Sequence, residues 1–340
     1  MKTASDTKKL ILFYLVPEFT LLAFTSALEA LRLANQVIGD EVYEWRIVTR
    51  DGKIVRASCG LSITPDLSLT EARKLRTGGV KLDMAIVCAG RNVQDHLDRT
   101  LDAWLRECRS QRIAIGAICT GPYLLANAGL LVDKRCTIHW ENYPSFAEVF
   151  SDAQASPQIY EVDDGIYTCA GGTSSLDMML HIISEHHGPE AARKICQQAI
   201  VGTVRHKSER QRLPFSLSQD IKHRALQAAI ELMSENMTQT LPLTLLAKKV
   251  GISRRQMERQ FQSNTGCSPS RFYVKLRVER AKALLEQTAM PVVEVAIACG
   301  FTSSSHFSKV YRTNEGETPI QTRKPKRSKD LMASSAAMSA

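Results

Sequence analysis

Two stretches of the chain, PLTLLAKKVGIS at residues 242–253 and PVVEVAIACGFT at residues 291–302, repeat one pattern 49 residues apart. In each stretch a Pro precedes a short apolar helix with a central Ala, a Gly ends it, and an apolar residue leads to a hydroxyl side chain. Left-handed Gly residues commonly end helices, and Ser or Thr commonly caps the next one. The repeat therefore predicts two helix-turn-helix units with Ser253 and Thr302 as N-caps. A plain helical bundle is the alternative.

The charge distribution points to the same region. Residues 217–340 contain 19 Lys and Arg against 10 Asp and Glu, whereas residues 1–216 contain 25 of each, so the net charge of +9 lies entirely in the last third. A compact basic domain suits a polyanion, because neutralising phosphates releases counterions. The pattern indicates double-stranded DNA as a partner, and a solvated basic face is the alternative.

Helical periodicity divides the second helix of each unit into two faces. Met257 and Phe261 are expected to face the core, as are Phe307 and Tyr311 if the second turn has one extra residue. The opposite faces predict the DNA-binding residues, which are Arg254, Arg255, Glu258 and Arg259 in the first unit and Ser304, Ser305, His306 and Lys309 in the second. Arg can bind guanine through two hydrogen bonds and Glu can accept one from cytosine. Short Ser side chains read bases weakly, so the second helix is expected to position more than to specify.

This region resembles a known family. The text "LTLLAKKVGISRRQMERQF" followed by "MPVVEVAIACGFTSSSHFSKVYRTNEGETP" is similar to AraC-type DNA-binding domains, and we assign residues 218–322 to such a domain. The resemblance implies two recognition helices that enter successive major-groove segments on one face of promoter DNA. Residues 211–217 are predicted to be a linker and residues 323–340 a disordered tail.

The first part of the chain alternates strands and helices. Strands are expected at 10–16, 45–49, 84–88 and 113–117, and helices at 26–35, 97–108, 121–128, 174–187 and 190–210. This order predicts an α/β fold over residues 8–210, with a doubly wound, mostly parallel sheet. No run approaches ~20 apolar residues, and the first residues lack a secretory pattern, so a cytoplasmic protein without a membrane span is expected.

Nine cysteines are present, an odd number without a C-x-x-C pair, and most lie in apolar runs. They predict reduced, mostly buried thiols rather than disulfides or a metal site, and no cofactor is expected. Cys119 is distinct, because it lies between an apolar strand and a helix that begins near Gly121. That is the arrangement of a nucleophile elbow, where a helix N-terminus can lower the pKa of a thiol. His139 follows 20 residues later, and Cys with His can form an activated thiolate. A buried, small apolar Cys is the alternative.

The pieces "MAIVCAG", "GAICTGP", "TIHW" and "CAGGTSSLDMML" resemble the class I glutamine amidotransferase-like superfamily, in its PfpI and glyoxalase-like branch. The resemblance implies a flavodoxin-like fold, Cys119 as the elbow residue, His139 as its partner, and an anion-binding niche formed by the amides of Gly90 and Thr120. Catalytic members carry a Glu after the Phe of the first loop, whereas here Thr20 follows Phe19. This difference predicts a non-catalytic sensor domain.

Together the two resemblances match the GlxA-type family of AraC regulators. They imply a regulator that responds to a small nitrogenous inducer, either an amino acid or a quaternary amine such as arginine, carnitine or glycine betaine. We further expect an activator that forms a homodimer, because tandem half-sites add affinity, and that contacts RNA polymerase. Trp140 could stack on a cationic ligand and Glu141 could pair with it, so both join Gly90, Cys119, Thr120 and His139 as predicted ligand-binding residues. A core role for Trp140 and a helix-terminal role for Glu141 are the alternatives.

Two other functions remain open on the sequence. The first part could be a cysteine-dependent hydrolase or a glyoxalase-like lyase fused to a DNA-binding domain. It could also be a redox sensor that acts through the Cys119 thiol.

Overall fold

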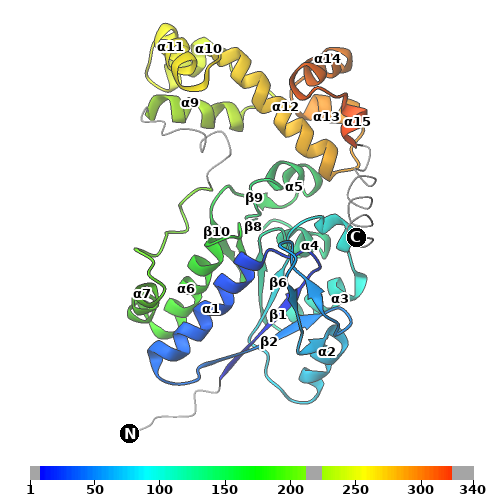
Figure 1. The fold of residues 1–340 in the computed structure, drawn as a ribbon, viewed down its shortest axis with the longest axis vertical. Coiled ribbons are helices and arrows are strands. Elements are labelled where there is room, and N and C mark those ends of the chain that lie inside the picture. The colour runs from blue at the N-terminus through cyan, green and yellow to red at the C-terminus, as the bar shows by residue number, and fades with distance from the viewer. Residues whose placement is uncertain (1–7, 212–223, 324–340) are drawn as a thin grey trace, which may run out of the picture. The chain divides into compact units, whose positions relative to one another are not determined.

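The computed structural model describes residues 8–211 and 224–323, which belong to two compact units divided between Gln211 and Arg212. The first unit is an α/β domain and the second is entirely helical in its described residues (Figure 1). No helix within the described ranges is long and apolar enough to cross a membrane.

A seven-stranded sheet forms the centre of the first unit, in the order β10-β11-β7-β6-β1-β2-β5. All neighbouring strands are parallel except β10 and β11. The strands are β1 (Lys9–Leu15), β2 (Tyr43–Thr49), β5 (Leu67–Ser68), β6 (Met84–Cys88), β7 (Ala114–Ile118), β10 (Tyr160–Asp163) and β11 (Ile166–Cys169). The central strands are continuous apolar runs because both faces of a parallel sheet are covered. The predicted doubly wound, mostly parallel sheet is confirmed.

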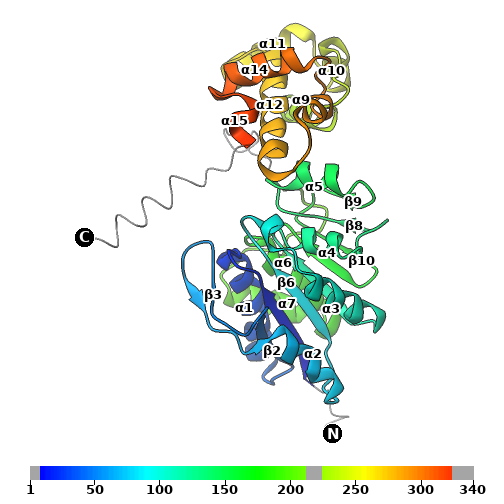
Figure 2. The same cartoon turned by 90° about the vertical axis from the view of Figure 1, so that its right-hand side faces the viewer.

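Helices cover both faces of this sheet (Figures 1 and 2). Successive side chains of a strand point to opposite faces, so Phe13 lies in one core and Leu12 in the other. One face packs against α1 (Leu21–Ile38), α6 (Ser174–His187) and α7 (Pro189–Gln198). The other packs against α2 (Leu69–Thr77), α3 (Arg99–Ser110), α4 (Pro122–Asn127) and α5 (Tyr143–Val149). Smaller elements are the ribbon of β3 (Val55–Arg56) and β4 (Ser62–Ile63), the 3₁₀ helix η1 (Val93–His96), and the pair β8 (Arg135–Cys136) and β9 (Gln154–Ala155).

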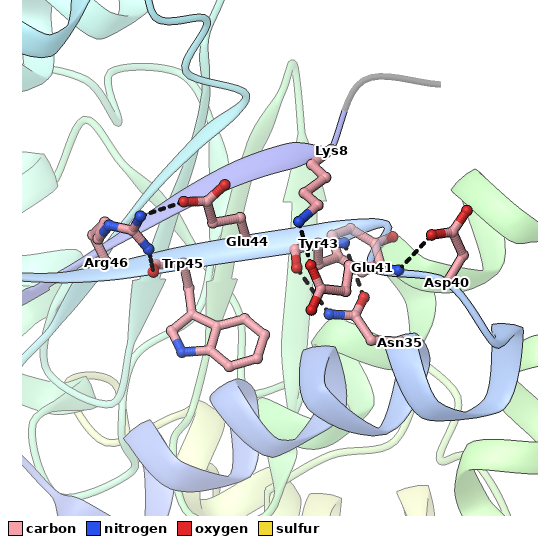
Figure 3. Close-up of polar contacts among 8 residues, drawn as sticks. All are labelled: Lys8, Asn35, Asp40, Glu41, Tyr43, Glu44, Trp45 and Arg46. Carbon is pink, nitrogen blue, oxygen red and sulfur yellow. Dashed lines mark hydrogen bonds and ion pairs between the residues drawn. The ribbon is translucent and has the colours of Figure 1, made fainter. Parts of the chain in front are cut away.

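The turn from α1 into β2 shows how a helix is tied to the sheet. The side-chain amide of Asn35 donates to the carbonyl of Tyr43 at 2.8 Å and accepts from its N–H at 2.9 Å (Figure 3). Gly39 ends α1 in the left-handed conformation with φ 79°. An ion pair between Lys8 and Glu41 joins the start of β1 to the same turn.

The predicted helix at 190–210 is wrong in its second half. Helix α7 ends at Gln198, and Ile200 takes a positive φ of 54°. The following chain instead hydrogen-bonds to the segment before β10, where the Ile159 N–H donates to the Glu209 carbonyl at 2.9 Å. Contacts between distant segments decide this conformation, and local periodicity does not report them.

The predicted linker and tail lie mostly outside the described residues. Gln211, the first residue of the predicted linker 211–217, is hydrogen-bonded into the first unit through its N–H, which donates to the Pro157 carbonyl at 2.7 Å. Residues 212–217 are outside the described ranges. Arg323, the first residue of the predicted tail 323–340, is the last residue of α15, and 324–340 are also outside.

The second unit contains two helix-turn-helix pairs, as the repeat predicts. Its described helices are α9 (Arg224–Glu235), α10 (Leu243–Lys249), α11 (Arg254–Thr265), α12 (Pro269–Gln287), α13 (Val292–Ala298), α14 (Ser304–Glu315) and α15 (Pro319–Arg323). Helices α10 and α11 form the first pair, α13 and α14 form the second, and α12 joins them (Figure 1). Each pair has its own apolar core.

The N-caps of α11 and α14 differ in register. Ser253 caps α11 through a capping box with Gln256. In the second pair the predicted cap Thr302 is wrong, because Ser303 caps α14 by accepting from the His306 N–H. The second turn contains one residue more, so the repeat shifts from 49 to 50 residues after Gly300. The same shift buries Phe307 and Tyr311, which are predicted to be equivalent to Met257 and Phe261 of the first pair.

Candidate functional site

Cys119 lies in a strained turn between β7 and α4. Its φ is 62°, in the left-handed region that side-chain-bearing residues rarely adopt, and it is 5% exposed. Gly171, with φ 84°, packs against it so closely that an added Cβ would lie 2.6 Å from the Cys119 Cβ. A Cβ on Gly121 would lie 2.6 Å from the Val87 carbonyl oxygen. Two glycines therefore make room for this elbow.

Burial governs the pKa of the Cys119 thiol. Burial raises its pKa to about 11, against the opposing effects of the Thr20 hydroxyl and the Thr120 amide. The Thr20 Oγ1 lies 3.4 Å from the Cys119 Sγ. Loss of hydration is the largest effect on this pKa, and the helix that follows the turn, α4, has only 6 residues. At neutral pH the group is a neutral thiol.

His139 is beside Cys119 through its backbone rather than its side chain. The His139 N–H donates to the Cys119 carbonyl at 3.1 Å. Burial lowers the pKa of His139, and the Glu141 carboxylate, whose Oε2 is 3.7 Å from Nδ1, opposes that effect. In the described part of the chain no hydrogen bond joins the His139 ring to the Cys119 sulfur. The predicted pair is therefore close in space, joined by this backbone hydrogen bond.

The first loop provides no acid to this thiol. Thr20 occupies the position beside the sulfur, while the Glu18 carboxylate accepts a hydrogen bond of 2.8 Å from the Asn92 side chain. Gly90 is buried under the same loop, where an added Cβ would lie 2.2 Å from the Glu18 carbonyl oxygen. The Gly90 carbonyl accepts from the Thr120 hydroxyl at 2.7 Å. This hydrogen bond joins Gly90 to Thr120, the residue that follows Cys119.

Three consecutive residues after β8, His139, Trp140 and Glu141, are partly or fully exposed. The rings of His139 and Trp140 are 5.4 Å apart at 37°, and the Glu141 side chain is 59% exposed. An aromatic face next to a carboxylate is chemistry that suits an organic cation. Among the described residues no group of His, Cys, Asp and Glu is arranged to hold a metal ion.

Gln211, which is predicted to begin the linker, contacts the segment that leads into this site. Its side-chain Nε2 donates to the Thr137 hydroxyl at 3.0 Å, the Ile138 carbonyl at 2.8 Å and the Gln158 carbonyl at 3.1 Å. These partners are 53 to 74 residues away in the sequence, so no local signal could identify the contact. Gln211 is the last described residue of the first unit, and its side chain is hydrogen-bonded to the two residues just before His139.

An ion pair between a buried Asp and a partly exposed Arg anchors the same segment a few residues earlier. Asp177 on α6 is 3% exposed and accepts from Arg205 at Nε (3.0 Å), at Nη2 (2.6 Å) and at the backbone N–H (2.9 Å). The Arg205 guanidinium also donates to the Thr173 hydroxyl at 2.8 Å. Paired charges of this kind fix a segment because separating them leaves a buried charge without a partner.

Helix α11 exposes all four predicted DNA-binding residues, Arg254, Arg255, Glu258 and Arg259. Met257 and Phe261 on its other face are buried. The Arg254 Nε is 3.0 Å from the Glu258 Oε1, so these two charges offset each other. Arg255 and Arg259 are left as the cationic pair that faces solvent.

Helix α14 exposes Ser304, Ser305, His306 and Lys309, as predicted. Arg312 is not among the predicted residues, although it is exposed and lies on the helix face of Ser305 and Lys309, at i+7 and i+3 from them. Its counterpart 50 residues earlier is Gln262, on the face of Arg255 and Arg259. The same periodicity extended by one turn would have found both residues.

Comparison with known proteins identifies the same two domains. A model of the DJ-1/PfpI family matches residues 9–185, and a model of the helix-turn-helix domain matches residues 246–325. The HTH-type transcriptional regulator GbdR of Pseudomonas aeruginosa is 40% identical over 307 residues, which are 90% of this chain and 82% of that protein. The HTH-type transcriptional regulator GlxA of Rhizobium meliloti is 32% identical over 322 residues, 94% of this chain and 97% of that one. A crystal structure of an AraC family transcriptional regulator from Pseudomonas putida covers 56% of this chain and 99% of its own, with 25% identity and a TM-score of 0.50.

A DJ-1/PfpI domain followed by a double helix-turn-helix domain defines a class of DNA-binding transcription regulators. The chain belongs to the AraC-type family of HTH regulators that carry this N-terminal domain, together with GlxA and GbdR.

Proposed function

We propose that the first unit is a non-catalytic receptor for a small nitrogenous metabolite, an amino acid or a quaternary amine, and that its occupancy controls DNA binding by the second unit. The observation that carries the proposal is the state of Cys119. It is a buried thiol whose pKa is raised to about 11, with the Thr20 hydroxyl 3.4 Å from its sulfur. An elbow of this kind supports a binding pocket better than a nucleophile.

The proposed ligand site consists of Gly90, Cys119, Thr120, His139, Trp140 and Glu141. Trp140 would stack on the cationic group of the ligand, and the exposed Glu141 carboxylate would pair with it. Because burial lowers the pKa of His139, its ring is neutral at pH 7 and does not repel a cation.

Gln211 supports a route from this site to the second unit. Ligand binding that moves residues 137–141 would change two of the three acceptors of the Gln211 amide, the Thr137 hydroxyl and the Ile138 carbonyl. The chain continues from Gln211 toward the DNA-binding domain. A ligand can shift such an equilibrium only if it binds the two states with different affinities.

The proposed output is activation of transcription. Arg254, Arg255, Glu258 and Arg259 would read or position DNA from α11, and Ser304, Ser305, His306 and Lys309 from α14. We extend the proposal to a homodimer, since paired sites add affinity through effective concentration. The dimer would contact RNA polymerase in the cytoplasm, where promoter DNA lies.

Thermal unfolding in the presence of L-arginine, L-carnitine and glycine betaine tests the receptor. A ligand that binds only the folded state adds about 2.7 kcal/mol of stability at a concentration of one hundred times Kd. The Tm increase from one compound should disappear in Trp140→Ala and Glu141→Gln. It should remain in Glu29→Gln, which removes an exposed carboxylate on α1, far from Glu141 in the sequence.

The enzyme alternative makes a different prediction. Turnover of an amide or a 2-oxoaldehyde that is lost in Cys119→Ser would make the first unit a catalyst and would contradict the receptor proposal.

A further inference from the structure

Helix α12 holds both helix-turn-helix pairs through two side chains one turn apart. The Tyr273 hydroxyl donates to the Asn236 carbonyl at 2.5 Å and accepts from the Leu241 N–H at 3.3 Å. These two residues belong to the loop between α9 and α10, which leads into the first pair. The Arg277 Nε donates to the Cys299 carbonyl at 2.6 Å, in the turn of the second pair. Its guanidinium carbon also lies 3.8 Å from the centroid of the Phe301 ring.

The loop and the turn that α12 holds also contact each other directly. The Thr238 hydroxyl donates to the Ala298 carbonyl at 3.0 Å. Gly300, with φ 72°, lies so close to the loop that an added Cβ would be 2.3 Å from the Met237 carbonyl oxygen and 2.8 Å from that of Thr238. We call this set of contacts the bridge; it consists of loop 236–241, turn 298–301, Tyr273 and Arg277.

The first helix-turn-helix pair provides an internal control for Gly300. Gly251 is the equivalent residue of the first turn and has nearly the same conformation, with φ 74°. Nothing lies within 4 Å of a Cβ built on Gly251. The turn itself therefore needs a positive φ, whereas the close backbone contact at Gly300 is specific to the bridge.

Because each pair has its own core, α12 alone would leave their relative orientation open to bending. The bridge adds contacts to the side of α12, so that loop, turn and helix restrain each other. We propose that the bridge fixes the distance and rotation between α11 and α14, and that the protein therefore recognises two DNA segments only at one spacing. This inference rests on DNA binding through both pairs and names a determinant of its specificity.

DNA spacing is a direct test, since one helical turn of B-DNA is about 10–10.5 base pairs. The full-length protein would first select duplexes from a random pool, and footprinting would locate the two protected segments. One, two or five base pairs would then be inserted between them. We expect the wild type to lose roughly tenfold or more in affinity with each insertion, because one recognition helix loses its base contacts.

The variants Gly300→Ala and Thr238→Val should bind the selected duplex several-fold more weakly, and their loss on insertion should be smaller than that of the wild type. Gly251→Ala introduces the same methyl group at the same φ without touching the bridge, so it should keep the full wild-type penalty. Circular dichroism checks that each variant is folded. If Gly300→Ala does not fold, Thr238→Val and Arg277→Lys carry the test.

Equal spacing penalties in the wild type and in folded bridge variants would overturn the inference, as would a wild type that tolerates the insertions. Failure to select any sequence would overturn DNA recognition itself, and the inference with it.

Discussion

The side-chain amide of Gln211 donates a 2.8 Å hydrogen bond to the backbone carbonyl of Ile138. Ile138 is fully buried, and the next residue, His139, donates its own N–H to the Cys119 carbonyl. One continuous set of hydrogen bonds therefore connects the elbow to the end of the first unit. This relationship makes Gln211 the residue through which we expect the ligand site to act.

Replacing Gln211 by Ala should separate ligand binding from the DNA response. Losing the partner of buried carbonyl groups costs about 1–3 kcal/mol, which is enough to release the end of the first unit. An inducer should still raise the Tm, but its effect on DNA affinity, followed by fluorescence anisotropy of labelled duplex, should fall several-fold. Gln197→Ala is the matched control, because that side chain is exposed on α7. An unchanged inducer effect in Gln211→Ala would contradict this route.

One thiol per chain should react rapidly with a disulfide reagent at pH 8. Cys59 is exposed and the other eight cysteines are buried. With a pKa of about 11, Cys119 is only about one-thousandth thiolate at this pH. The fast reaction should disappear in Cys59→Ser and persist in Cys119→Ser. A fast phase lost in Cys119→Ser would instead support the redox sensor.

The raised pKa of Cys119 also predicts a pH dependence of stability. Because the folded value of about 11 lies above the ordinary value of 9.0, the fold favours the neutral thiol. This contribution is complete below pH 9 and is lost as pH rises toward 11. Between pH 8 and pH 10.5 the wild type should lose about 2 kcal/mol more than Cys119→Ser, which does not ionise. Urea unfolding followed by Trp fluorescence measures the difference, since all three Trp residues lie in the first unit.

Local patterns predicted most of the fold, because its elements carry their own signals. The strands β1, β6 and β7 report their burial through continuous apolar runs. Met257 and Phe261 report theirs through helical periodicity. The cap of α14 was misplaced because Thr302 and Ser303 both carry hydroxyl groups. The burial of Phe307 shows that Ser303 is the cap, because the position of Phe307 on α14 depends on the number of residues in the turn.

The candidate site was predictable in position and not in chemistry. The elbow at Cys119 follows from a strand, a glycine and a helix that are adjacent in sequence. Its pKa depends instead on burial and on Thr20, which is 99 residues away, and the elbow itself depends on Gly171. Gln211 escaped notice for the same reason, since its partners become neighbours only in the folded protein.

Substitutions on the two recognition helices should have different effects on DNA binding. Arg255→Ala and Arg259→Ala should each cost about 1–3 kcal/mol and relax sequence preference at one base position. Lys309→Ala and Arg312→Ala should weaken binding to all sequences and reduce the salt dependence by about one phosphate contact. Titrations of selected and scrambled duplexes at several salt concentrations would measure both. Arg193→Ala removes an exposed arginine from the first unit and should change neither. A uniform loss in the α11 variants would contradict base reading by that helix.

The two neighbouring glycines behind Cys119 offer a final matched pair. Both have a positive φ, 84° at Gly171 and 57° at Gly172, so an Ala at either position is strained by about 1–2 kcal/mol. A Cβ on Gly172 meets nothing within 4 Å, whereas one on Gly171 would lie 2.6 Å from the Cys119 Cβ. Gly171→Ala should therefore lose about 1–3 kcal/mol more than Gly172→Ala in urea unfolding followed by Trp fluorescence. It should also displace Cys119 and weaken the response of Tm to the inducer, because the Cys119 carbonyl is the acceptor that holds His139. Equal losses of unfolding free energy in the two variants would mean that the turn at Cys119 deforms at little cost. Its close packing would then not hold the ligand site in place.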